Sequence, residues 1–504
     1  MIASWFFRRQ NYLPLHRNVN DIGKQVVSGS VWSGIEVGST TVLQFVRSIL
    51  FARILMPADF GALSLATIFT EFILIFANFG FNASIIYQSE LDKKDLSTTW
   101  WGNFTIDGSV AVICVAFALL SSRFSTDHTT SYIICFLAIQ FLILSFASIN
   151  MALMRRQFMF KQLASARMSN TVVSFLSAWF FVAILNLGVY GLVAGMIIGN
   201  VFMTLMFLYF VPWLPSFTFS FAYLRRHLNY GGWFLGVNLI TYINGNMDKA
   251  IVGTYLNVTQ LGFYEYASSI PLMVVNKLSQ ALNSVLFPAF SSIQRSSEQL
   301  GALLLKVYRY NALLIFPILT GIALVAPDFV LAAYGDKWHP VIEPLRFFCL
   351  FGMLRIFINP FYPLCNGIGK PQLPFKWIAI YLPINVLLMF VGVKYFGILG
   401  AIQVRLLLPM FMTFTMGWEI LKIIDVKYME LVKSIKPALV CCFLMSIIVL
   451  LVQQFVTAGF ETPLPRLFVQ IFIGIIVYYV SMFIFFRSDM IFVLDKIRSK
   501  KSKI

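Results

Sequence analysis

The segment LFVQIFIGIIVYYVSMFIFF, residues 467–486, contains twenty residues and no charged side chain. A helix of this length rises about 30 Å, which matches the hydrocarbon core of a bilayer. Comparable segments recur along the chain of 504 residues, of which 59% are hydrophobic and 12% are charged. Soluble domains carry about 25% charged residues. The composition therefore excludes a soluble enzyme and predicts an all-α polytopic membrane protein.

Apolar runs separated by charged residues, proline or glycine predict about fourteen transmembrane helices. None of the connectors between them is long enough for a folded domain. The predicted helices lie near residues 26–51, 60–87, 101–120, 132–154, 168–187, 189–211, 231–256, 261–287, 303–326, 341–364, 377–396, 399–420, 438–456 and 467–486.

The 38 basic residues are distributed unevenly between the two predicted faces of the membrane. The N-terminus, the even-numbered connectors and the C-terminus hold 27 of them, whereas the odd-numbered connectors hold five. Loops enriched in Lys and Arg stay on the cytoplasmic side, so both termini are predicted to be cytoplasmic. The alternation supports the helix count, because one missed helix would invert every later loop. Most of the formal charge of +17 is thus a topological signal, and no nucleic-acid partner is expected.

Two sequence matches relate the first six predicted helices to the next six. Residues 55–66, LMPADFGALSLA, align with residues 256–267, LNVTQLGFYEYA, at an offset of 201. Residues 188–191, GVYG, likewise match residues 397–400, GILG, at an offset of 209. Six helices return the chain to its starting side, so the duplicated units have parallel topology. The sequence therefore predicts two pseudo-symmetric six-helix lobes followed by two C-terminal helices.

The predicted organisation has five parts. In transporters built from two such halves, the substrate path runs between them. The parts are a cytoplasmic N-terminal segment (1–25), an N-lobe with helices 1–6 (26–212), a C-lobe with helices 7–12 (229–422), the last two helices (437–487) and a basic cytoplasmic tail (488–504).

Six basic residues remain inside the predicted helices. A central Arg or Lys costs roughly 2.5–3.5 kcal/mol to insert, so it is expected to face water or a polar partner. Arg346 lies near a helix end and is expected to reach the interface by snorkelling. The remaining five are Arg47, Lys249, Lys277, Arg355 and Arg405. They favour a polar cavity for an anionic substrate, with closed internal ion pairs as the alternative.

Polar residues recur at helical spacing on the first two helices of both lobes. On the first helix, Ser33, Glu36, Thr40, Gln44 and Arg47 form one stripe. On the eighth helix, Asn276 and Gln280 belong to a similar stripe. Three membrane carboxylates, Glu36, Glu71 and Asp248, are candidates for coupling to H⁺ or Na⁺, and equally for counter-ions of the buried cations.

The segments at the helix junctions resemble a known transporter family. In the first lobe they are SGSVW (28–32), LFARILMPADFG (50–61) and FGFNASIIYQ (79–88), and in the second lobe NMDKAIVGTYL (246–256), LFPAF (286–290) and YGDKW (334–338). Together they resemble the polysaccharide transporter family of the MOP flippase superfamily, over about residues 20–420. The resemblance implies a MATE/MOP-like fold of two lobes.

The resemblance also implies a function. Members carry undecaprenyl-diphosphate-linked oligosaccharide units across the bacterial inner membrane by alternating access, for O-antigen, capsule or exopolysaccharide synthesis. A polymerase and a chain-length regulator of the same pathway are then expected partners. Because Arg and Lys form charge-assisted hydrogen bonds with phosphate, our hypothesis is that Arg47, Lys249 and Arg355 hold the diphosphate, with Lys277 and Arg405 as further members. Gln44, Asn276 and Gln280 suit the sugar hydroxyls.

Other functions remain open at this stage. Within the superfamily, the alternatives are a peptidoglycan-precursor flippase and a drug antiporter, although an antiporter for cations favours an acidic cavity. A membrane polymerase or transferase is a further alternative, which short outer loops and the placement of all four His in tails or loops disfavour. No GxxxxGK[ST] phosphate-binding loop is present and the six Cys lack CxxC spacing, so neither ATP hydrolysis nor a metal site is expected.

Overall fold

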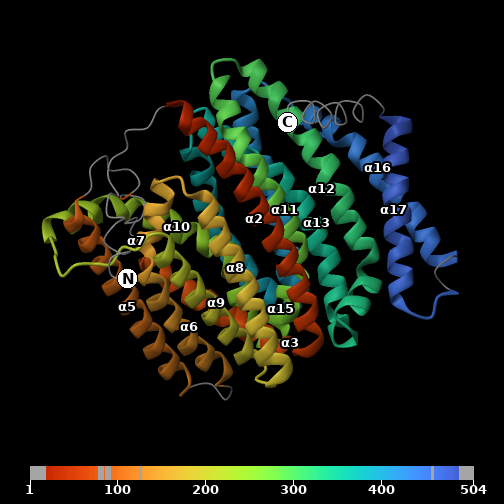
Figure 1. Ribbon diagram of the computed structural model, residues 1–504. Helices are drawn as coiled ribbons and strands as arrows, with labels where there is room; N and C mark the ends of the chain where they lie inside the picture. Colours follow the sequence, from red (N-terminus) through yellow and green to blue (C-terminus); the bar gives the residue numbers. More distant parts are fainter. Residues whose placement is uncertain (1–18, 78–84, 86–91, 124–127, 456–458, 487–504) are drawn as a thin grey trace. The chain divides into compact units, whose positions relative to one another are not determined.

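The computed structural model describes residues 19–77, 85, 92–123, 128–455 and 459–486 (Figure 1). Most of the predicted N-terminal segment, the whole of the predicted basic tail and the end of the predicted helix 60–87 lie outside these residues. The described residues contain helices and short connectors, without a strand. They divide into two compact units, Met1–Asn246 and Met247–Ile504, with the division inside one helix, α10.

The first unit begins with two helices joined by a short turn and ends in the first part of α10. Its helices, with a π-helical turn η1 that extends α8, are α2 (Val19–Ile54), α3 (Pro57–Ala77), α5 (Lys93–Ser121), α6 (Thr129–Phe146), α7 (Ser148–Arg156), α8 (Phe160–Trp179), η1 (Phe180–Ile184), α9 (Val189–Phe210) and α10 (Phe221–Tyr255).

The second unit contains the remaining helices and a short 3₁₀ helix, η2. In chain order they are α11 (Val258–Ser292), α12 (Ser297–Ala333), η2 (Asp336–Val341), α13 (Ile342–Ile358), α14 (Phe361–Gly367), α15 (Gln372–Ile423), α16 (Tyr428–Phe455) and α17 (Pro463–Phe485).

The observed helices follow the predicted order. Two predicted helices are each divided in two, as α6 with α7 and α13 with α14, and α15 contains two predicted helices that meet at Gly397. Within the described residues, ten helices are long and apolar enough to cross a membrane. The chain is therefore a multi-pass helical membrane protein, as the composition predicts.

Several helices begin earlier than the apolar runs predict. α5 begins at Lys93, α10 at Phe221 and α16 at Tyr428, between eight and ten residues before the predicted starts. These extensions contain charged residues, which are good helix formers but do not belong in hydrocarbon. A search for apolar runs therefore finds the part of a helix inside the bilayer and misses its polar extension.

The two GxxG matches adopt the same backbone conformation. Gly188 has φ 57° and ψ −138°, and Gly397 has φ 59° and ψ −140°. Only glycine adopts this region readily, because a Cβ atom would collide with the backbone. At both positions the conformation turns the chain from one helix into the next, which gives a structural reason for the sequence match.

Replacing either glycine by alanine is expected to destabilise the protein. Space is available at both positions, since no atom lies within 4 Å of an added Cβ. The expected cost, about 1–3 kcal/mol, therefore comes from backbone strain alone. Thermal unfolding in detergent would measure it for Gly188→Ala and Gly397→Ala, with Gly236→Ala as the control, because Gly236 lies inside α10 and is equally uncrowded. A similar loss in the control would contradict the strain argument.

The other repeated segment also has matching local structure. At the start of α3, the Met56 amide donates to the Asp59 carboxylate at 2.9 Å. At the start of α11, the Asn257 side chain accepts from the Gln260 amide at 2.8 Å. These are the two reciprocal bonds of a capping box, one in each unit, and the offset of 201 relates both pairs. Each bond closes the turn of a helical hairpin.

A buried polar network attaches the last two helices to α12. The Gln470 side chain in α17, which is almost completely buried, donates to Asp328 at 2.7 Å and accepts from Gln453 of α16 at 3.1 Å. Gln453 also donates to the Leu324 carbonyl at 2.9 Å. Interhelical hydrogen bonds of this kind hold helices together where lipid removes the hydrophobic driving force.

We expect Gln470→Leu to loosen this attachment. The substitution removes the donor to Asp328 and the acceptor for Gln453, two hydrogen bonds to partly buried side chains, at a cost of about 1.5–3 kcal/mol for the bond to the carboxylate and about 0.5–1.5 kcal/mol for the other. The measurement is the rate of proteolysis in the connector between α16 and α17, with Gln453→Leu as a second variant of the same network. Unchanged cleavage in both variants would show that packing alone holds the two helices.

Candidate charged site

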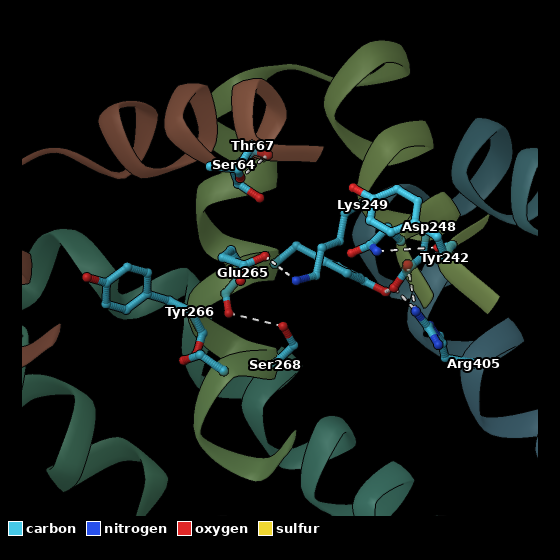
Figure 2. Close-up of polar contacts among 12 residues, drawn as sticks. Ser64, Thr67, Tyr242, Asp248, Lys249, Glu265, Tyr266, Ser268 and Arg405 are labelled. Atoms are coloured by element: carbon cyan, nitrogen blue, oxygen red, sulfur yellow. Dashed lines mark hydrogen bonds and ion pairs between the residues drawn. The ribbon is translucent and has the colours of Figure 1, made fainter. Parts of the chain in front are cut away.

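Four charged side chains from α10, α11 and α15 form two ion pairs in the second unit, here called the charge cluster (Figure 2). Asp248 of α10 accepts from Arg405 of α15, with an Oδ1 to terminal nitrogen distance of 2.6 Å and an Nε to Oδ2 distance of 2.8 Å. Lys249 of α10 lies 2.7 Å from Glu265 of α11. The charge cluster is therefore electrically neutral.

Helix geometry explains why the adjacent residues Asp248 and Lys249 form ion pairs with different helices. Asp248 and Lys249 are consecutive, so their side chains point about 100° apart around α10. Lys249 and Glu265 lie eight residues before and eight residues after Asn257, the cap between α10 and α11. Residues at equal distances from such a turn face each other in an antiparallel hairpin. The Lys249–Glu265 pair thus follows from the hairpin itself, whereas the Asp248–Arg405 pair requires α15 to pack nearby.

Aromatic residues complete the environment of the Asp248–Arg405 pair. The Tyr264 hydroxyl donates to Asp248 Oδ2 at 2.6 Å, and the Arg405 guanidinium lies 5.6 Å from the centre of the Phe351 ring. The exposed fraction of the side chain is 2% for Asp248 and 15% for Arg405. Two buried charges in this environment are stable only together, because either one alone would lack compensation.

A second polar face runs between α11 and α13. The Arg355 guanidinium of α13 donates to the Asn276 side-chain oxygen at 3.0 Å, and Asn359 donates to the Ser279 hydroxyl at 2.8 Å. Lys277 is half-buried beside Asn276. Among the side chains that the structure describes, neither Arg355 nor Lys277 has an acidic partner within ion-pair distance. Within the described part of the chain these two cations therefore lack a carboxylate partner, unlike those of the charge cluster.

Gln280 lies one turn beyond Asn276 on α11, and its side chain is exposed. It and Asn276 therefore provide amide groups on the same stretch of helix as Lys277. Three of the residues predicted to bind substrate thus occur within five consecutive positions of α11, and Arg355 contacts one of them.

In the first unit, the predicted stripe on α2 contains an ion pair and a cation–aromatic contact. Glu36 lies 3.1 Å from Arg167 of α8, with exposed side-chain fractions of 14% and 39%. Arg47 lies 5.8 Å from the ring centre of Phe51, one turn along the same helix. Gln44, on the same helix, and Glu71, on α3, have exposed side chains.

The structure therefore gives the predicted site residues different roles. Asp248 and Glu36, two of the carboxylates proposed for ion coupling, are counter-ions, of Arg405 and Arg167 respectively. Lys249 and Arg405 already have carboxylate partners. Arg355 and Lys277 remain together with Asn276 and Gln280 on the α11–α13 face, defined here by these four residues.

Sequence reasoning missed three contributors. The three candidate carboxylates predicted from the sequence do not include Glu265, and Tyr264 is not among the predicted site residues, although their distances from Asn257 place both opposite the charged end of α10. Arg167 lies just before the predicted helix 168–187, whereas α8 begins at Phe160 and includes it. Equal spacing around the helix turn at Asn257 is a signal that predicts the Lys249–Glu265 contact.

Comparison with known proteins identifies the family. The model of a family described as polysaccharide biosynthesis protein matches residues 50–343. The lipopolysaccharide biosynthesis protein WzxC of Escherichia coli (strain K12) is 26% identical over 462 residues, which cover 90% of this chain and 88% of that protein.

Solved structures show the same fold at low sequence identity. The lipid II flippase MurJ in an inward closed conformation has a TM-score of 0.70 and 15% identity, with 92% of this chain and 100% of that chain covered. An inward-facing multidrug resistance MATE family transporter of the MOP superfamily has a TM-score of 0.61 and 15% identity, with 77% and 95% covered. The predicted MATE/MOP-like fold is therefore confirmed. Because the family model matches more than half of its residues, the chain belongs to the polysaccharide biosynthesis protein family.

Proposed function

We propose that the chain is a flippase that moves undecaprenyl-diphosphate-linked oligosaccharide units from the cytoplasmic to the periplasmic leaflet by alternating access, for surface polysaccharide synthesis. Its family membership, its similarity to WzxC and its MurJ-like fold support this function. The headgroup of such a substrate combines a charged diphosphate with sugar hydroxyls, neither of which crosses hydrocarbon unaided. The protein must therefore supply both cations and neutral hydrogen-bonding groups inside the membrane.

The observation that carries the proposal is the α11–α13 face. Arg355 and Lys277 have no acidic partner among the described side chains, and Arg355 is oriented by a neutral amide, Asn276. A guanidinium held in this way keeps donors for phosphate, with which it forms strong charge-assisted bonds. Asn276 and Gln280 suit sugar hydroxyls. We therefore assign the diphosphate first to Arg355 and Lys277.

Lys249 and Arg405 have a different proposed role. A phosphate group would have to replace the Asp248 or Glu265 carboxylate before either cation could bind it. We propose that these residues hold α10, α11 and α15 together, and bind substrate only if the pairs exchange partners during transport. Arg47 remains a candidate diphosphate ligand in the first unit, with Gln44 beside it on the same helix.

The proposed coupling ion is H⁺ or Na⁺. Of the three candidate carboxylates, Glu71 is exposed and shares a hydrogen bond with the neutral Tyr242 hydroxyl, whereas Asp248 and Glu36 are in ion pairs with arginines. Glu71 is therefore the first carboxylate to test. No covalent bond of the substrate changes in this function, so the chain is proposed not to be an enzyme.

We place the protein in the bacterial inner membrane with both termini in the cytoplasm, on the distribution of Lys and Arg between the connectors. In this orientation the protein takes up its substrate from the cytoplasmic leaflet, where the oligosaccharide is assembled on its lipid carrier. A polymerase and a chain-length regulator that act on the exported unit are the proposed partners.

A peptidoglycan-precursor flippase is the second candidate, because the MurJ fold matches over 92% of this chain and its substrate, lipid II, gives the fold a named lipid-linked cargo. Reconstitution separates the candidates. The purified chain, in proteoliposomes, is given fluorescent undecaprenyl-diphosphate oligosaccharide or fluorescent lipid II, and a membrane-impermeant quencher reports translocation. We expect translocation of the oligosaccharide substrate, and none of lipid II or of a cationic dye; translocation of lipid II alone would favour the second candidate. Dye transport without lipid transport would refute the proposal in favour of a drug antiporter.

A further inference from the structure

A cavity of about 420 Å³ lies between α12, α13 and α16, and none of its lining residues belongs to the charge cluster or the α11–α13 face. Its walls are mostly apolar, with contributions from α12 (Ala323 and Leu324), α13 (Leu350 and Met353) and α16 (Leu450). The volume falls in the range of about 300–1,000 Å³ that is typical of small-ligand sites. The proposed transport function does not use this cavity.

One end of the cavity carries a cation. The exposed Arg346 side chain lines it and donates from Nε to the Ala323 carbonyl at 3.2 Å. This bond fixes the guanidinium at the cavity and leaves the two terminal nitrogens without a partner among the described residues. Arg346 lies in the first turns of α13, directly after η2, so the charged end of the cavity is near the end of a transmembrane helix.

The opening of the cavity is apolar. Leu350 and Leu450 both line the cavity and are exposed, at 47% and 53%. Exposed leucine side chains inside a membrane span indicate contact with acyl chains, because an aqueous path would carry polar groups. From Arg346 to Met353 the cavity follows eight residues of α13, a rise of about 10 Å. A charged end and an apolar channel of this length match an amphiphile with a single anionic head.

We propose that this cavity binds an anionic glycerophospholipid of the surrounding membrane, with its phosphate on Arg346 and part of one acyl chain between α12, α13 and α16. Charge complementarity selects the headgroup, since a guanidinium with two unused donors matches a phosphate oxygen pair. Basic pockets between transmembrane helices bind phospholipid headgroups in this way. A bound lipid would contact α12, α13 and α16 together.

The test uses the full chain, purified and delipidated, with phosphatidylglycerol as the probe and native mass spectrometry as the readout. We expect one tightly retained phosphatidylglycerol, about tenfold weaker retention in Arg346→Ala, and weaker retention of the zwitterionic phosphatidylethanolamine by the unaltered chain. Ala323→Phe, which fills the cavity and keeps the cation, should lose the lipid too.

Arg466→Ala is the matched control, because the half-buried Arg466 also donates its Nε to a carbonyl, that of Phe460, but does not line the cavity. Its lipid retention should equal that of the unaltered chain. The proposal is overturned if Arg346→Ala retains phosphatidylglycerol normally, if both arginine variants lose it equally, or if both lipids bind equally well. Arg346→Gln, of similar length, decides the outcome if Arg346→Ala does not fold.

Discussion

Replacing Asp248 by alanine is expected to cost about 3–5 kcal/mol of folding free energy, the largest loss from any single change in the charge cluster. The change leaves Arg405 charged and largely buried without its carboxylate, and it also removes the acceptor of the Tyr264 hydroxyl. The cost arises mainly because the buried Arg405 charge is left without a partner. The net contribution of an intact buried ion pair to folding stability is small. Thermal unfolding in detergent, followed by size-exclusion chromatography of the remaining folded fraction, measures the loss.

Two further variants test this explanation. Replacing both members, as Asp248→Leu with Arg405→Met, removes the buried charge and should recover most of the lost stability. Glu36→Ala is the matched single control, because its partner Arg167 is 39% exposed and can be hydrated when the carboxylate is removed. Its cost should be about 1 kcal/mol or less. If Asp248→Ala and Glu36→Ala are equally mild, Asp248 is not the structural counter-ion that the geometry indicates.

The fold was largely predictable because membrane helices are local features of the sequence. Twenty apolar residues span a bilayer whatever their neighbours are, so residues 467–486 were recognisable without any knowledge of packing. The repeated glycines were equally informative, since Gly188 and Gly397 both adopt a backbone conformation that other residues avoid. Helix starts were less predictable, as Phe221 of α10 shows, because charged residues continue a helix into water.

The pairing of charges was less predictable, for a reason of distance along the chain. Lys249 and Glu265 are close in sequence and face each other across one hairpin, so their contact can be predicted from the sequence. Asp248 and Arg405 are separated by 157 residues, and no local pattern specifies how α15 packs against α10. Counts of charged residues alone therefore do not show how many buried cations lack an acidic partner. Tertiary packing decides which of them retain an acidic partner.

Arg355→Gln is expected to reduce transport of the lipid-linked oligosaccharide by roughly 10- to 150-fold, the equivalent of losing one charged hydrogen bond of about 1.5–3 kcal/mol. Glutamine keeps a donor for Asn276 but cannot supply the positive charge that phosphate requires. Lys277→Gln should change transport in the same direction. Initial rates in proteoliposomes at several substrate concentrations would measure the effect, and export of surface polysaccharide by cells would confirm it.

The same variant should leave folding stability nearly unchanged, because removing Arg355 exposes no carboxylate that depended on it. This expectation is the opposite of the one for Asp248→Ala, so the two variants separate substrate binding from structural ion pairing. Lys394→Gln is the control for loss of a cation, because the Lys394 ammonium lies over the ring of its own neighbour, Tyr395, on an exposed part of α15. Normal transport by Arg355→Gln, with normal membrane insertion, would remove Arg355 from the proposed diphosphate site. Reduced transport accompanied by reduced stability would instead show that Arg355 is structural.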